Sequence, residues 1–177
     1  MFKEEALEVL KNRRAIRKFK PEQITDEELN AVLEAGIYAP TGEGRQSPLI
    51  VAVQSPEYVE RVSYISAALM GFRFSAYYGA PTIILVFETA RAGDAEMGII
   101  DASAVCTNMV NAAYAVGLGS CWIHRCKEVF ETPEGKELLC EWGITEPVRG
   151  VASIALGYAD CPHPKAHARR EGYVVKV

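Results

Sequence analysis

The chain has 177 residues, 49% of them apolar, which is enough to bury the core of a single domain. Its 19 lysines and arginines face 23 aspartates and glutamates, so the formal net charge is −4. This balance offers no broad basic surface, and neither nucleic acid nor an anionic membrane is expected as a partner.

Cysteine content and the amino-terminal residues bear on where the protein works. The five cysteines are odd in number and contain no C-x-x-C pair, which argues against a disulfide framework and a zinc site. The opening MFKEEALEVLKNRR is charged from its third residue and lacks the apolar stretch of a signal peptide. No run is long and apolar enough to cross a bilayer. We expect no metal, no membrane insertion and a cytoplasmic location.

The first half of the chain predicts helices that alternate with short strands. EEALEVLKN (4–12) has helical spacing of its apolar residues, and a second helix follows a T-x-x-E capping box at 25–28 and stops at GIYAP. LIVAV (49–53) and PTIILVF (81–87) are interpreted as buried strands. Ser55 and Pro56, as N-cap and first-turn proline, start another helix.

The second half predicts one long buried helix and two more strands. Residues 96–116 are apolar or small on nearly every face, which indicates a helix running through the middle of the molecule. SCWI (120–123) and RGVASIALGY (149–158) predict strands, and a helix opens at Thr132 and ends at Gly143. Residues 159–177 resemble an arm more than a core element. The alternation predicts a layered α+β or α/β domain and leaves the activity open.

A cluster of positive charge follows the first predicted helix. NRRAIRKFK (12–20) carries five cations within nine residues, namely Arg13, Arg14, Arg17, Lys18 and Lys20. Cations in a last helical turn interact favourably with the exposed carbonyls there and need no ligand. In an acidic chain, the alternative is that the cluster holds a small anion. Position along the chain leaves both interpretations open.

Five blocks taken together resemble the nitroreductase family of FMN-dependent oxidoreductases. They are RRAIRKF, EAGIYAPTGEGRQSP, YGAPTIILVF, the small-residue helix leading into AVGLGSCWI, and IALGY before a basic tail. The resemblance covers almost the whole chain, taken as one domain over residues 1–177. It implies an α+β three-layer sandwich with a central, mostly antiparallel sheet flanked by helices. It also implies a homodimer in which the arm at 159–177 places its strand on the partner.

The resemblance assigns the basic segment to FMN. Arg13 and Arg14 are expected to contact the phosphate or ribityl chain, and Arg17 to lie toward N1 and the C2 carbonyl of the ring. The arginine fork matches a phosphate dianion, and charge-assisted hydrogen bonds are the strong ones. Ala15 stands in place of the usual serine, which should weaken binding only modestly. Lys18 and Lys20 are expected to be surface cations.

Two further segments are matched to the phosphate end less closely. In HPKAHARREGY, Arg169 is the best match to the basic segment that returns to the phosphate in relatives, and a solvated charge run is the alternative. The other candidates in this tail are Lys165, His167 and Arg170. Arg73 falls near the place of an amide or lysine that relatives carry before the second strand.

The loop APTGEGRQSP is matched to the ribityl and pyrimidine side of the flavin. The positions that keep the family pattern A-P-[ST]-x-x-N-x-Q-P-W are Pro40, Thr41, Gly42 and Gln46. The positions that depart from it are Gly44, Ser47 and Pro48. A glycine-rich surface turn without a ligand is the alternative interpretation of the loop.

GLGSCWIHR is matched to the segment along the dimethylbenzene and N5 edge of the ring. Trp122 and Ile123 would pack on one flavin face, and the backbone N–H of His124 would point at N5. Trp122 as a core aromatic is the competing interpretation. Cys121 and Cys126 flank this place, and buried structural cysteines are the commoner case than a redox pair.

By this resemblance, NADH or NADPH delivers hydride to the flavin, and an electron-poor acceptor such as a nitroaromatic or a quinone is then reduced in a ping-pong cycle. No catalytic acid or base is evident, and no G-x-G-x-x-G fingerprint tells which nucleotide is used. The alternatives are a flavin-binding storage or redox-sensing module, a dehalogenase, or a flavin-destroying relative. Only roughly 20 residues separate VFETA from the middle of the long helix, so the substrate lid is short.

Overall fold

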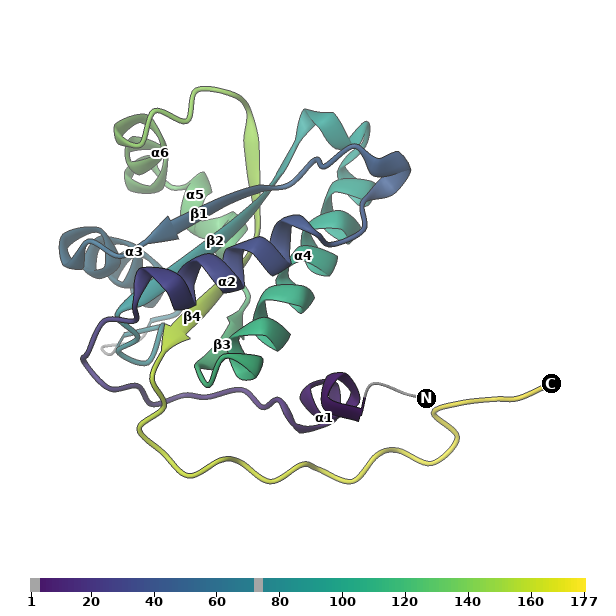
Figure 1. Cartoon of the computed structure of the whole chain (residues 1–177). Helices are drawn as coiled ribbons and strands as arrows, with labels where there is room; N and C mark the ends of the chain where they lie inside the picture. Colours follow the sequence, from purple (N-terminus) through teal and green to yellow (C-terminus); the bar gives the residue numbers. More distant parts are fainter. Residues whose placement is uncertain (1–3, 72–74) are drawn as a thin grey trace.

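The computed structural model describes residues 4–71 and 75–177. They form three layers, with one sheet in the middle and helices on each of its faces (Figure 1). The sheet has four strands in the order β1-β2-β4-β3, and every neighbouring pair is antiparallel. The strands are β1 (Leu49–Val53), β2 (Thr82–Thr89), β3 (Gly119–Ile123) and β4 (Val148–Gly157). The predicted α+β sandwich with a mostly antiparallel sheet is therefore confirmed.

Helices cover both faces of the sheet. One face carries α2 (Asp26–Ile37) and α4 (Ala95–Ala115), which lie side by side in Figure 1. The other face carries α3 (Pro56–Leu69), α5 (Cys126–Glu131) and α6 (Pro133–Glu141). The remaining elements are α1 (Glu4–Asn12), η1 (Gly42–Gly44) and η2 (Ala90–Ala92). None of the helices described here is long and apolar enough to span a bilayer.

β2 is one of the two inner strands of the sheet, and an apolar run, Ile83 to Phe87, forms its middle. All eight residues of β2 are buried, because helices pack against both faces of the sheet at this strand. Ile83, Leu85 and Phe87 join the cluster under α3, α5 and α6, while Ile84 and Val86 join the cluster under α2 and α4. Successive side chains of a strand point to opposite faces, so one apolar run supplies both cores.

Side-chain caps set the starts of three helices. The capping box of α2 is present: Thr25 Oγ1 accepts from Glu28 N at 3.2 Å, and Glu28 Oε2 accepts from Thr25 N at 2.9 Å. Asp94 caps α4 and Thr132 caps α6. Ser55 precedes α3 as predicted, but its side chain makes no capping bond.

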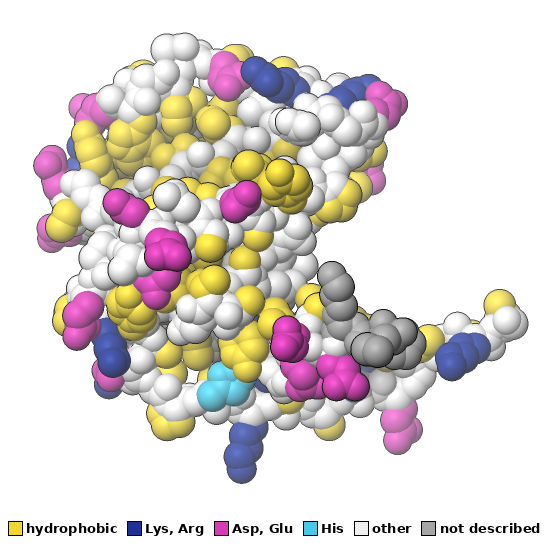
Figure 2. Space-filling view, viewed as in Figure 1, with side chains coloured by type: hydrophobic (Ala, Val, Ile, Leu, Met, Phe, Trp, Pro, Cys, Tyr) yellow, Lys and Arg dark blue, Asp and Glu magenta, His cyan; other side chains and the backbone are white. Residues whose placement is uncertain are grey.

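Two predictions about burial are wrong for the single chain. LIVAV forms β1, which is an edge strand: Val53 is buried, but Ala52 is exposed. The long helix α4 lies in an outer layer, with Ile99 38% and Ile100 54% exposed. One chain covers only the side of α4 that faces the sheet and α2. Figure 2 shows hydrophobic side chains scattered over the exposed surface on this side of the molecule.

The tail begins by pairing with the segment after α1 and then leaves the body. Ala159 bridges Phe19, and Asp160 N donates to Lys18 O at 3.0 Å. Beyond His163, which still contacts the end of α1, the chain runs away from the body toward the carboxyl terminus (Figure 1). Tyr173 and Val175 near its end are 74% and 80% exposed.

Candidate functional site

The basic segment runs beside the edge strand β3. Ile16 N donates to Ser120 O at 2.9 Å, and Ala15 bridges Ser120 in parallel. This close approach depends on Gly119, where a Cβ would lie 3.0 Å from the Ile16 side chain. The pairing explains how the sequence following α1 is held at this end of the sheet. The adjoining cavity of about 120 Å³ is lined by residues including Arg13, Arg14, Tyr114, Ser120 and His163.

The cations of the segment have different environments. Arg14 Nη1 donates to Lys11 O at 2.8 Å and to Arg13 O at 2.6 Å, so this guanidinium serves the end of α1, as the ligand-free interpretation predicts. Its Nε is buried and unpaired among the described residues. Burial raises the pKa of the Cys121 thiol, and the guanidiniums of Arg17 and Arg13 oppose that rise. Arg13 and Arg17 thus lie within electrostatic reach of β3.

Arg13 and Arg17 are the two arginines of this segment whose side chains remain for an anion. Within the described ranges, neither side chain makes a hydrogen bond or an ion pair to another residue. Lys18, by contrast, pairs with Asp160 at 2.6 Å on the surface. An unpaired arginine fork matches a phosphate group well, so the donor chemistry fits the FMN phosphate.

The tail cations are not brought to this cluster. The residues at 165, 167, 169 and 170 are exposed in the extended part of the tail, and Arg170 lies over the ring of Tyr173. The tail residues that line the cavity are Ala159 and His163. His163 Nε2 lies 2.8 Å from Asn12 O, and the His163 ring is 5.5 Å from that of Tyr114. Our sequence reasoning missed His163 because no periodic pattern selects it. Arg73 lies outside the described residues.

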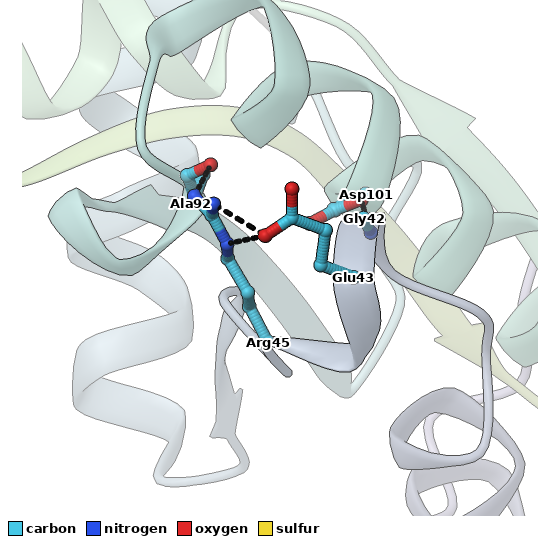
Figure 3. Close-up of polar contacts among 5 residues, drawn as sticks. All are labelled: Gly42, Glu43, Arg45, Ala92 and Asp101. Atoms are coloured by element: carbon cyan, nitrogen blue, oxygen red, sulfur yellow. Dashed lines mark hydrogen bonds and ion pairs between the residues drawn. The ribbon is translucent and has the colours of Figure 1, made fainter.

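The loop that follows α2 carries the second set of predicted residues. Gly42 N donates to Asp101 Oδ1 at 2.8 Å, and Gln46 N donates to Thr41 Oγ1 at 3.0 Å. Pro40 and Gln46 are exposed, and Thr41 is half-buried. Figure 3 shows Gly42 beside Asp101.

A second anchor ties the same loop to the turn before α4. Arg45 Nη1 donates to Ala92 O at 2.8 Å, and Arg45 also pairs with Glu43 at 2.6 Å (Figure 3). Glycine suits position 93, because φ is 92° and a Cβ there would displace the Arg45 guanidinium. The loop is therefore tied to α4 and to η2, unlike an unanchored surface turn.

The end of β3 presents its three predicted residues in different ways. Trp122 is 38% exposed, and its ladder partner Ile154 places it on the sheet face that carries α4. Ile123 is 8% exposed and packs in the opposite cluster, so its side chain cannot share a flavin face with Trp122. His124 is exposed, and the chain turns at Arg125 with φ 87°. The side chains of Trp122 and His124 and the main chain are thus available to a ligand here, whereas the Ile123 side chain is not.

The structure brings some predicted residues together and keeps others apart. Arg13 lies near Tyr114 at one end of α4, whereas Gly42 is bonded to Asp101 near the other end. Thirteen residues of helix separate Asp101 from Tyr114, which corresponds to about 20 Å. A single chain therefore carries two separate half-sites, one with the cations and Trp122 and one with the loop at 40–46.

Thiol chemistry has little support at this place. Burial raises the pKa of Cys126 to about 12, and burial also raises that of Cys121. A thiolate is the reactive form, so both groups are suited to packing. Across the described ranges, no cluster of three His, Cys, Asp or Glu side chains could hold a metal ion.

Comparison with known proteins gives consistent matches. A model of the nitroreductase family matches residues 10–71 and 66–158. A protein of Archaeoglobus fulgidus that bears the name NADH dehydrogenase/NAD(P)H nitroreductase is 27% identical over 155 residues, covering 88% of this chain and 86% of that protein. A nitroreductase with bound FMN from Bacteroides fragilis has a TM-score of 0.87 at 28% identity and 98% coverage of both chains. A nitroreductase with bound FMN from Desulfitobacterium hafniense has a TM-score of 0.88 at 25% identity and 100% coverage of both chains.

The chain forms a three-layer α+β protein in which Arg13 and Arg17 lie near the edge strand β3 without a side-chain partner among the described residues, and Trp122 of the same strand is exposed. The chain belongs to the nitroreductase family, a family of FMN-dependent oxidoreductases.

Proposed function

We propose that the protein binds FMN and uses it to transfer reducing equivalents from NADH or NADPH to an electron-poor acceptor, such as a nitroaromatic or a quinone. The observation that carries this proposal is that Arg13 and Arg17, near the strand β3 that bears the exposed Trp122, have no side-chain partner in the described part of the chain. The similar nitroreductases of Bacteroides fragilis and Desulfitobacterium hafniense have bound FMN, which supports the choice of cofactor.

Each residue of the first half-site would have a distinct task. Arg13 would bind the phosphate, and Arg17 would place positive charge beside the ring, where negative charge develops on reduction. Trp122 would pack against the ring, and the exposed turn at His124 would offer a backbone N–H. Bound FMN would supply the redox chemistry by accepting a hydride and passing it on. Arg14 would hold the segment to α1 rather than carry the phosphate alone.

We further propose a homodimer that completes the site, built from one domain per chain with 159–177 as an arm. The two half-sites at opposite ends of α4 support this, because a second chain related by a two-fold axis can bring them together. Exposed Ile99 and Ile100 offer an apolar surface, and β1 has an open edge. The β-prone end YVVKV is suited to such an edge.

A cytoplasmic location is also part of the proposal. All five cysteines are free in the structure, and free thiols suit a reducing compartment.

The test begins with an absorbance spectrum of the purified protein. We expect a yellow protein with about one FMN per chain and no FAD, since one terminal phosphate suits this cluster. NADH and NADPH are then added in turn without oxygen, followed by a panel of acceptors. A colourless protein that ignores added FMN would end the proposal. Bound flavin that neither nucleotide bleaches would instead favour a storage or redox-sensing module.

A further inference from the structure

Asp101 carries a carboxylate into the interior of the protein. It lies on α4 beside Ala102, and its residue is only 2% exposed. A buried carboxylate is costly unless hydrogen bonds replace its hydration. Both oxygens are satisfied here, since Oδ1 accepts from Gly42 N at 2.8 Å and Oδ2 accepts from Ser47 Oγ at 2.6 Å. Both donors belong to the loop at 41–47, so the buried Asp101 side chain binds that loop.

The loop has a backbone that requires such support. Glu43, Gly44 and Gln46 have φ values of 54°, 67° and 50°, in the left-handed region. Non-glycine residues persist in that region where the surrounding structure imposes it, and such residues are common at ligand-binding sites. Asp101 holds the two ends of this stretch, at Gly42 and Ser47, and leaves the strained residues exposed between them.

Ser47 is held from a second side. Thr89 Oγ1, at the end of β2, donates to Ser47 O at 2.7 Å. The hydrogen bond from Ser47 Oγ to Asp101 needs a side-chain hydroxyl at this position. The proline usual at this place in the family pattern has no donor and could not make it. Ser47 departs from the family pattern, and in this chain its hydroxyl has a hydrogen-bond acceptor, Asp101.

The clamp determines where Thr41 and Gln46 lie. Both residues line a cavity of about 140 Å³ together with Ile37, Ile50 and Val105. We propose that Asp101 is a positioning residue for the flavin: by clamping Gly42 and Ser47, it holds this loop in the geometry that binds the cofactor. The inference rests on the proposed function, because the loop's contact with FMN is part of that proposal. Because Asp101 is only 2% exposed, it would act through the loop and not by contact with the flavin.

Four variants separate positioning from folding. Asp101→Ala removes both acceptors, and Ser47→Ala removes one donor. Asp101→Asn keeps the shape and retains a polar atom at both positions. Ser103→Ala is the control, since this hydroxyl on the same helix donates within the helix to Ile99 O at 2.7 Å.

The first readout needs no flavin. Trypsin cleaves after Arg45, which lies inside the clamped loop, and the rate is followed by mass spectrometry. We expect several-fold faster cleavage in Ser47→Ala and Asp101→Ala, because a loosened loop opens more often. Asp101→Asn and Ser103→Ala should match the parent protein. Equal cleavage in all five proteins would overturn the clamp.

The second readout is the FMN dissociation constant, measured by fluorescence titration at a temperature where circular dichroism shows each variant folded. We expect binding weakened about tenfold in Asp101→Ala and about threefold in Ser47→Ala. A purely structural role would lower the melting temperature and leave the dissociation constant unchanged. If Asp101→Ala does not fold, the dissociation constant of Ser47→Ala tests the positioning role.

The outcomes also separate this inference from the proposed function. A parent protein that ignores FMN overturns the proposed function and the positioning role together. A parent protein that binds FMN, with Ser47→Ala binding it equally well, overturns the positioning role alone.

Discussion

Replacing Arg13 and Arg17 together with alanine should remove most of the flavin. Neither guanidinium has a partner in the described part of the chain, so the apoprotein should fold with nearly unchanged stability. A hydrogen bond to a charged group contributes about 1.5–3 kcal/mol, so two such contacts correspond to about 3–6 kcal/mol. That range raises the dissociation constant about 100-fold to 10,000-fold. Because Arg17 is exposed, screening favours the lower end, about 100-fold.

The assay is a fluorescence titration of FMN into apoprotein, with a thermal melt of each variant as the check on folding. The matched control is Lys18→Ala with Lys20→Ala, which removes the same two charges from the same segment but leaves the arginines in place. A general loss of positive charge would weaken binding equally in both double variants. The reasoning is refuted if the arginine variant melts like the parent protein and still binds FMN within threefold of it.

The remaining predictions concern turnover, assembly and pH. Turnover should be ping-pong if, as proposed, donor and acceptor use one flavin face in succession; intersecting double-reciprocal lines would contradict it. Deleting residues 160–177 should abolish dimer formation and flavin binding together. A truncated chain that sediments as a monomer with stoichiometric FMN would disprove a flavin site shared between two chains. Glu28→Ala should lower the free energy of unfolding by about 0.5–2 kcal/mol at pH 7, because the capping box is lost. Hydrogen bonds from Thr25 and Tyr158 lower the pKa of Glu28, so this contribution is present above the carboxyl's usual pKa and disappears as pH falls through the depressed one. In urea unfolding, the two proteins should therefore converge in acid, and a constant difference would count against the capping role.

Local sequence patterns predicted most of the helices and strands, because helix caps and apolar periodicity depend on residues only a few positions apart. The capping box at 25–28 fixed the start of α2, and the apolar run in β2 identified a strand buried on both faces. The six-residue helix α5 was missed, since it is too short to show a helical period. The cations after α1 were found as a group, but the sequence alone could not separate Arg14, which binds helix carbonyls, from Arg13 and Arg17.

The tertiary structure decided the features that depend on distant residues. LIVAV is apolar whether its strand is central or at an edge, and only the strand order places β1 at the edge. Asp101 meets Gly42 and Ser47 across 59 and 54 positions of the chain, a contact that no local spacing encodes. The separation of the two half-sites likewise follows from the length of α4 and from which end each segment packs against. A sequence pattern records which residues share a helix turn or a strand face, whereas the folded chain determines which of those faces meet.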